Sequence, residues 1–485
     1  MTSSTLPFAA DFAQMHRAID AVMPLRIVGQ VTAASGLSIE AAGLSLPVGS
    51  LCRIDSFGGR QSLAEVIGFN GDRTLLMSLS ATGGVARGDR VENLAAGPLM
   101  RCCEQLLGRV IDGMGRPIDG KGPLPMGQWR RVDGRGVACL DRTSIDKPIA
   151  TSVRAIDAIS TCGMGQRMGI FSGPGVGKST LLSQIAKHTS ADVSVVALIG
   201  ERGREVVEFI QHNLGEAGMK RCAMVVSTSD DAPLLRVRAA RVACTVAEFF
   251  RDRGLNVLLL MDSLTRLCHA QRQIGLAARE PPATKGFPPS VFALLPEIME
   301  RAGRTATGSI TGFYTVLVEG DDFNEPIPDA VKGISDGHVW LSRPLANRGH
   351  FPAIDILQSI SRVRGSVATA EQVKQALRVM SLHAAWRDIE DLVSIGAYVP
   401  GINVEHDLAC QARSRIEMFL RQDSRSPTTL EQAFVQLGEL TVWIDQLEKV
   451  IRSQAAKPVG SARAPDGAQA GGNAAGRPAV KAAAR

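Results

Sequence analysis

Hydrophobic residues follow three different patterns along the chain, and each pattern predicts a different structure. Between residues 25 and 96, short apolar stretches are separated by glycine-rich turns, which is typical of a small closed β-barrel. From about residue 150, Val, Ile and Leu runs alternate with helical segments, which predicts a parallel sheet covered on both faces. Residues 366–452 follow a period near 3.6 and predict helices.

These patterns also predict where individual elements lie. The barrel strands are expected at Ile27–Val31, Leu44–Val48, Ala64–Ile67 and Thr74–Met77. Sheet strands are expected at Met168–Phe171, Val193–Ile199, Ala223–Val226, Val257–Met261 and Thr311–Val318, with helices at 179–188, 234–253 and 266–276. The apolar face of the C-terminal helices is expected to hold Val373, Leu377, Met380, Ile389, Leu392, Val393, Ile416, Phe419 and Leu420.

The fold class is therefore α/β, with a small barrel before the central domain and helices after it. The predicted segments are an N-terminal helical segment at 1–23, a β-barrel domain at 24–97, a central domain with its connector at 98–365, a helical domain at 366–452 and a tail at 453–485. The tail is rich in Ala, Gly and Pro and cannot bury enough apolar area to offset its ordering entropy, so we expect it to be disordered.

Composition narrows the class of protein. Hydrophobic residues make up 45% of the chain and charged residues 21%, which excludes a largely disordered protein. No apolar run approaches the length of a membrane span, and the first residues do not resemble a signal peptide. The nine cysteines include no Cys-x-x-Cys pair, so we expect a reduced, cytoplasmic chain without disulfides or a zinc site.

The net charge of +6 does not indicate a nucleic-acid groove. The tail carries five basic residues against one acidic residue, so most of the excess positive charge lies there and the folded body is nearly neutral. Aromatic residues are only 4% of the chain, which is few for a protein that stacks single-stranded bases. We therefore expect no specific nucleic-acid partner.

The strongest chemical motif is SGPGVGKST, from Ser172 to Thr180, between an apolar strand and a helix. Such a loop curls its backbone N–H groups around phosphate groups at a helix N-terminus. Lys178 would reach the β- and γ-phosphates, and the Ser179 hydroxyl would bind Mg²⁺. Ser172 stands where the strict motif has glycine. The candidate nucleotide-binding residues are Gly173, Pro174, Gly175, Val176, Gly177, Lys178, Ser179 and Thr180.

Two acidic residues follow buried strands and are candidates for the chemistry. Asp262 ends the run LLLMD and would hold Mg²⁺ at the carboxyl edge of the sheet. Glu201 follows VSVVALIG and is the candidate base that deprotonates the attacking water, with Glu205 as the alternative. Arg202 would stabilise charge beside it. Further along, Arg362 offers a planar guanidinium for the charge that develops during phosphoryl transfer.

Several longer motifs together resemble the type III secretion ATPases. They are GPGVGKST, LIGERGREVVEFI, VLLLMDSLTR, EPPATKGFPPSVFALLPEIMERAG, GSITGFYTVLVEGDDFNEPI and GHFPAIDILQSISR. This family comprises the flagellar export ATPase and its injectisome relatives, and both are related to the catalytic subunit of the rotary F-type ATP synthase. The resemblance covers about residues 25 to 450.

The resemblance implies a RecA-like central domain, a ring-shaped homohexamer, and ATP and Mg²⁺ as ligands. It places family roles on Lys178 and Ser179, on Glu201 and Asp262, on Phe351 for packing of the adenine, and on Arg362 as a finger into the neighbouring subunit's site. Phe351 stands where relatives commonly have Tyr, and it keeps the flat ring. The implied partners are export-gate, stalk and regulator proteins and chaperone–substrate complexes at the inner face of the cytoplasmic membrane.

The sequence leaves other functions open. Overall similarity favours flagellar export over an injectisome, but no single residue separates them. An RNA-translocating hexameric motor would share the central domain, and the neutral body and scarce aromatics argue against it. A rotary synthase subunit and a nucleotide-binding subunit without turnover are further alternatives. The presence of both Glu201 and Arg362 in one chain argues against the last of these.

Overall fold

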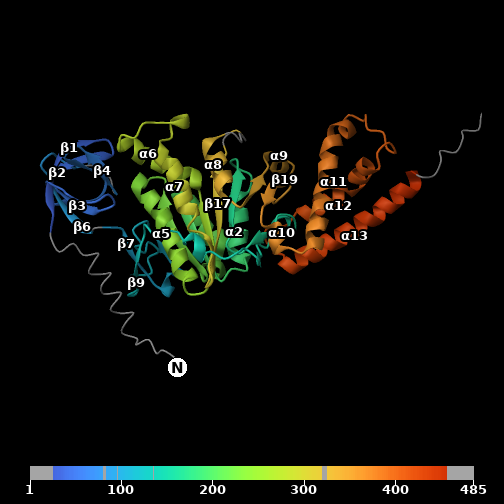
Figure 1. Cartoon of the computed structure of the whole chain (residues 1–485), viewed down its shortest axis with the longest axis horizontal. Helices are drawn as coiled ribbons and strands as arrows, with labels where there is room; N and C mark the ends of the chain where they lie inside the picture. The colour runs from blue at the N-terminus through green and yellow to red at the C-terminus, as the bar shows by residue number, and fades with distance from the viewer. Residues whose placement is uncertain are drawn as a thin grey trace, which may run out of the picture.

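The computed structural model describes residues 26–79, 84–95, 97–134, 136–318, 320 and 325–455. These residues form three parts in a row, with a β-barrel at one end, an α/β domain in the middle and long helices at the other end (Figure 1). This arrangement confirms the predicted fold class. The predicted helix within 1–23 and most of the tail predicted at 453–485 lie outside the described residues. Residues 453–455, which the prediction placed in the disordered tail, instead belong to the last helix, because the helical pattern continues into them. No helix in the described ranges is both long enough and apolar enough to cross a membrane.

The first part is a barrel of six antiparallel strands that closes by pairing its first strand with its last. The strands are β1 (Val28–Ser35), β2 (Ser38–Ala42), β3 (Leu51–Ser56), β4 (Arg60–Asn70), β5 (Arg73–Ser78) and β6 (Arg90–Ala95). Their order around the barrel is β1-β2-β5-β4-β3-β6. Inward-facing side chains such as Val31, Ile39, Ile54 and Val66 fill the interior.

One predicted barrel strand is wrong and three strands were missed. Leu44 and Leu46 are buried as expected, but the segment Leu44–Val48 is irregular. The strand that follows it is β3, in which buried Cys52 and Ile54 alternate with half-exposed charged residues. That alternation marks a half-buried strand, but it contains no continuous apolar run. The other missed strands are β2 and β6.

The central domain is built on a nine-stranded, mostly parallel sheet in the order β19-β18-β12-β17-β15-β13-β14-β8, with β16 paired to β17. Its strands are β8 (Val110–Ile111), β12 (Arg167–Ser172), β13 (Val193–Glu201), β14 (Cys222–Thr228), β15 (Asn256–Asp262), β16 (Gly303–Arg304), β17 (Ser309–Leu317), β18 (Gly337–Leu341) and β19 (Ile354–Ser361). Only β16 and β19 run antiparallel to their neighbours.

Helices cover both faces of this sheet. The main ones are α2 (Lys178–His188), α3 (Gly203–Glu208), α5 (Pro233–Arg251), α6 (Leu264–Ala277), α7 (Pro289–Met299), α8 (Pro326–Ile334), α9 (Arg343–Asn347) and α10 (Arg364–Val367). Along β13, Val195 and Ala197 pack with α5, α6 and α7, whereas Val196 and Leu198 pack with α2 on the other face. Because both faces of the strand are buried, its sequence is continuously apolar, as predicted.

The third part contains three long helices, α11 (Ala370–Ser394), α12 (Val404–Leu420) and α13 (Leu430–Ala455). Thr369 begins α11 with a capping box to Gln372. The predicted apolar face of α11 is partly wrong, because Leu377 and Leu392 are exposed. Ile389 is buried as predicted, and the buried face also holds Ala376, Val379, Leu382 and Trp386.

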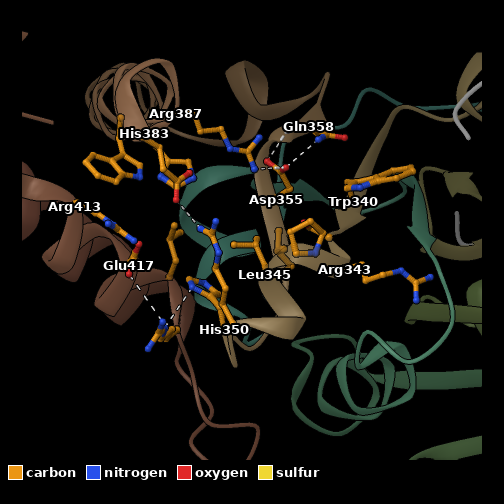
Figure 2. A pocket seen from close by; sticks show the side chains of 18 residues that line it. Trp340, Arg343, Leu345, His350, Asp355, Gln358, His383, Arg387, Arg413 and Glu417 are labelled. Atoms are coloured by element: carbon orange, nitrogen blue, oxygen red, sulfur yellow. Dashed lines mark hydrogen bonds and ion pairs between the residues drawn. The ribbon is translucent and has the colours of Figure 1, made fainter. Parts of the chain in front are cut away.

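The long helices join the central domain through apolar and polar contacts. Their buried side chains belong to the same cluster as those of α2. Around a cavity of about 510 Å³, charged pairs cross between the two parts (Figure 2). Arg387 of α11 donates to Asp355 of β19 over 2.7 Å, and Arg348 donates to Glu390 of α11 over 2.8 Å. The helical part is therefore docked on the edge of the sheet that carries β18 and β19.

A buried arginine ties the connector between the barrel and the central domain to the sheet helices. Arg301 is 1% exposed and binds both carboxylate oxygens of Glu248 in α5 over 2.7 Å. It also donates to the carbonyl oxygen of Val132 over 2.9 Å. The Arg301 and Glu248 charges are largely removed from water, so each depends on the other.

We expect Arg301→Ala to lower the free energy of unfolding by about 3–5 kcal/mol, because it leaves the buried Glu248 carboxylate without a partner. Chemical denaturation measures the change. The matched control is Arg116→Ala, which removes an exposed pair with Asp112 and should cost no more than about 1 kcal/mol. Equal effects of the two substitutions would show that the Arg301 pair does not stabilise the fold.

Candidate functional site

The loop SGPGVGKST connects β12 to α2 at the carboxyl edge of the sheet. We call residues Ser172–Thr180 the phosphate loop. Gly175 and Gly177 have φ angles of +77° and +87°, which residues with a Cβ atom rarely adopt. Ser172, the departure from the strict motif, is the last residue of β12. Its backbone is extended, so this position does not require glycine. The loop leaves the N-terminus of α2, with its free N–H groups, open to an anion.

Lys178, the first residue of α2, lies between two carboxylates. Its Nζ is 2.5 Å from Oδ1 of Asp262 and 3.8 Å from Oε1 of Glu201. Glu201 ends β13 and Asp262 ends β15, and these two strands are parallel neighbours. Their carboxyl ends therefore meet beside the phosphate loop. The structure thus brings together three of the predicted site residues.

Two residues that the sequence analysis did not select hold these carboxylates in place. The Thr315 hydroxyl, from β17, donates to Oδ1 of Asp262 over 2.7 Å. Arg266, from α6, donates to Oε1 of Glu201 over 3.1 Å. Arg266 lies in the first turn of α6, the helix that follows the strand ending at Asp262, and the available signal was this basic residue at the start of that helix. Thr315 carries no such signal, because it is one of many residues in a buried strand.

The environment of Glu201 favours its protonated form. Burial is the main cause and the nearby Asp262 carboxylate adds to it, and together they raise the pKa of Glu201 to about 7. Lys178 and Arg266 oppose the shift but do not cancel it. A carboxyl group whose pKa lies near neutrality is suited to accept a proton at physiological pH.

Ser179, Glu201 and Asp262 line a small cavity of about 80 Å³. Both described contacts of Asp262 use Oδ1, and no described residue donates to Oδ2. A hydroxyl and a free carboxylate oxygen are suitable ligands for Mg²⁺, which keeps several waters and binds phosphates as well. In the described ranges no three His, Cys, Asp or Glu side chains form a metal cage. The site therefore fits Mg²⁺ that is held mainly through water and phosphate.

Phe351 lies on the other side of the phosphate loop. It lines a cavity of about 460 Å³ together with Gly175, Gly177, Thr180, Leu181, Gln184, Pro352, Gln422, Asp423 and Ser424. A Cβ atom at Gly177 would lie 3.4 Å from the Phe351 ring. The ring is 46% exposed and offers a flat apolar face next to the loop. This position is suited to a nucleotide base whose phosphates occupy the loop.

Two predicted site residues, Arg202 and Arg362, make no polar contact with Lys178, Glu201 or Asp262 among the described residues. Arg202 is exposed and pairs with Glu205 over 3.3 Å. Arg362 directly follows β19, which runs antiparallel to β18, so it lies at the opposite edge of the sheet. Ser361 is level with Met168 rather than with Ser172, a separation of about 13 Å along the strands. Arg362 is exposed and lines neither cavity at the loop.

Three family descriptions match the chain. The nucleotide-binding domain of the ATP synthase alpha/beta family matches residues 152–361, and its beta-barrel domain matches residues 31–95. The T3SS EscN ATPase C-terminal domain matches residues 368–439.

The chain is also similar to whole proteins. It is 48% identical to a flagellum-specific ATP synthase of Pseudomonas aeruginosa, over 85% of this chain and 93% of that one. It is 45% identical to a type 3 secretion system ATPase of Sinorhizobium fredii, over 85% and 92%. The assembled ATPase EscN of enteropathogenic E. coli superposes with a TM-score of 0.81 at 42% identity, covering 85% of this chain and 99% of EscN. A second EscN structure, in complex with its central stalk EscO, gives 0.79 at the same identity and coverage.

We expect Lys178→Ala to abolish measurable binding of ADP, because it removes the cation that faces the phosphates and leaves two buried carboxylates that repel them. Isothermal titration calorimetry measures the affinity. Lys187→Ala, at the other end of α2, is the matched control and should bind like the parent. Retention of ADP binding by Lys178→Ala would show that the phosphate loop is not the anion site.

Proposed function

The chain belongs to the family of flagellum-specific and type 3 secretion ATPases, which is related to the ATP synthase alpha and beta subunits, and on that premise we propose that it hydrolyses ATP to energise flagellar protein export. The observation that carries the enzymatic part is the position of Lys178 between Glu201 and Asp262 at the phosphate loop. A nucleotide-binding subunit without turnover would not need a buried carboxylate with a pKa near 7 at this point.

Each residue around the phosphate loop has a separate role in the proposed reaction. The loop amides and Lys178 bind the phosphates, and Phe351 packs on the base. Ser179 and Asp262 would hold Mg²⁺, which would neutralise charge on the phosphates. Glu201 accepts the proton of the attacking water, and Arg266 orients its carboxylate. Thr315 fixes one oxygen of Asp262, so that the other faces the cavity.

The active assembly in this proposal is a homohexamer in which Arg362 completes the neighbouring site. Support comes from the sheet topology, because the antiparallel β19 places Arg362 at the edge opposite its own phosphate loop and leaves it exposed. Because one chain carries both Glu201 and Arg362, identical subunits can complete every interface. Arg202 is also exposed at the site edge, where it could contribute to the same interface.

Flagellar export is the branch we propose, with injectisome secretion as the alternative. The identities to a flagellum-specific relative and to a type 3 secretion relative, 48% and 45%, differ by little. The proposed partners are a stalk, an export gate, a regulator and chaperone–substrate complexes at the cytoplasmic face of the membrane. Expression in a flagellated host that lacks its own export ATPase tests the branch. Restored export of filament subunits supports it, whereas restored export only in an injectisome mutant refutes it.

The raised pKa of Glu201 predicts the pH dependence of turnover. Only the ionised carboxylate accepts a proton, so kcat/KM should fall as the pH drops through about 7. The measurement is initial-rate kinetics between about pH 6 and pH 8.5. Glu201→Gln should lose about 10²–10⁴-fold in kcat and this acidic limb, while its affinity for ADP remains. An acidic limb that persists in the residual activity of Glu201→Gln would assign it to another group.

Completion of the site between subunits predicts that activity rises with protein concentration and that Arg362→Ala loses about 10³–10⁵-fold in kcat. A mixing experiment separates this role from a structural one. Subunits with Glu201→Gln and subunits with Arg362→Ala are each inactive, but mixed rings contain interfaces with both residues intact and should regain activity. Mixtures that remain inactive, or activity per subunit that is unchanged by dilution, would contradict the hexamer proposal.

A further inference from the structure

Three separate segments of the chain meet at the backbone of Ser152. This residue has a φ of +58°, which is unfavourable for a residue with a Cβ atom, and it is 4% exposed. Its carbonyl oxygen accepts hydrogen bonds from Nε2 of Gln184 over 3.1 Å and from Nε2 of Gln422 over 2.9 Å. Gln184 belongs to α2, the helix that the phosphate loop begins. Gln422 belongs to the loop between α12 and α13. The Ser152 carbonyl therefore links the C-terminal helices to the phosphate-binding helix.

The side-chain amide and the backbone N–H of Gln422 are all used in this link. Its Oε1 accepts from the backbone N–H of Arg154 over 2.8 Å, and its Nε2 also contacts the Ser426 carbonyl and the Thr428 hydroxyl. Its own backbone N–H donates to the carbonyl oxygen of Phe351 over 2.9 Å. The side chain of Gln422 thus joins the C-terminal loop to the start of the nucleotide-binding domain, and its backbone joins that loop to Phe351, which lines the cavity of about 460 Å³.

Arg154 holds the same loop from its other end. Its guanidinium donates to the carbonyl oxygens of Phe419 and Arg421 over 2.5 and 2.6 Å, and to Oε1 of Gln436 in α13 over 2.6 Å. The carbonyls at the C-terminus of a helix lack partners within the helix and carry partial negative charge. Arg154 therefore anchors the end of α12 next to the cavity.

A second cavity lies behind Phe351. His350, next to Phe351, lines the cavity of about 510 Å³ between the central domain and the long helices (Figure 2). Its Nδ1 accepts a long hydrogen bond, 3.4 Å, from Arg421, and its buried Nε2 has no partner among the described residues. Phe351 is therefore weakly supported from the side of this cavity. The hydrogen bond from Gln422 is the short contact that fixes the Phe351 backbone to the C-terminal loop.

We propose that Gln422 is a positioning residue for the base of the nucleotide. It fixes Phe351 and the cavity-lining residues Asp423 and Ser424 at a set distance from the phosphate loop, through the shared Ser152 carbonyl. This inference rests on the proposed function, because it requires a nucleotide in that cavity. It implies that affinity for the base depends on the position of the C-terminal helices, whereas the chemistry at the phosphates does not.

The test is Gln422→Ala in the full chain, with ADP affinity measured by calorimetry and kcat measured at saturating ATP. We expect the ADP affinity to fall about tenfold and KM to rise about tenfold, because the substitution breaks a buried hydrogen-bond network. The kcat should stay within about twofold of the parent. Gln422→Glu keeps the acceptor for Arg154 but cannot donate to Ser152, so it should weaken binding similarly. Gln375→Ala, at a half-buried glutamine of α11 that bonds Glu371 of the same helix, is the matched control and should change neither quantity.

A double-mutant cycle with Arg154→Met separates positioning from general destabilisation. Because both residues act through one loop, their effects should overlap. The ADP affinity of the double variant should lie within about twofold of that of the single variant that binds ADP less tightly. Unchanged ADP affinity in Gln422→Ala, an equal loss in kcat, or fully multiplicative effects in the cycle would each overturn the inference. If the parent binds ADP and Lys178→Ala does not, such a result leaves the proposed function intact. If the parent fails to bind ADP, the proposed function itself fails.

Discussion

The site depends on the partial compensation of two buried carboxylates by Lys178, which lies between them, with Arg266 pairing with Glu201. Glu201 and Asp262 end neighbouring parallel strands, so the sheet forces their negative charges to lie together at its carboxyl edge. Lys178 can occupy the space between them because the phosphate loop starts α2 at the same edge. The cluster remains unbalanced, and burial with the extra negative charge raises the pKa of Glu201. A group that would be a poor proton acceptor at the surface is thereby adapted to neutral pH.

The direction of one strand explains why the proposed site needs a second subunit. The strands β12, β13, β15 and β18 run parallel and deliver their carboxyl ends to the phosphate loop, but β19 runs the other way. Phe351, just before β19, therefore lies beside its own loop, whereas Arg362, just after it, lies at the opposite edge. The two ends of one strand thus carry Phe351, which lines the cavity proposed for the base, and Arg362, which in the proposed hexamer completes the neighbouring site.

The base wall is built from segments that are far apart in the sequence. Phe351 comes from the approach to β19, Gln422 from the loop after α12, and Arg154 from the start of the nucleotide-binding domain. Their hydrogen bonds converge where the helical part meets the central domain, next to a cavity that crosses the same junction (Figure 2). This junction joins the region that binds nucleotide to the helices at the far end of the chain (Figure 1).

The sequence by itself determined the class of fold, the phosphate loop, and the acids at the strand ends. These features depend on local patterns: a glycine spacing, a continuous apolar run, and the first polar residue after it. The tertiary structure decided the features that depend on pairing between distant segments. It showed that β3 is a strand despite Arg53 and Asp55, because alternate residues face the barrel interior, and that Leu377 lies outside the buried face of α11. It also selected Arg266, Thr315 and Gln422, whose roles arise only from the neighbours that folding brings within hydrogen-bonding distance.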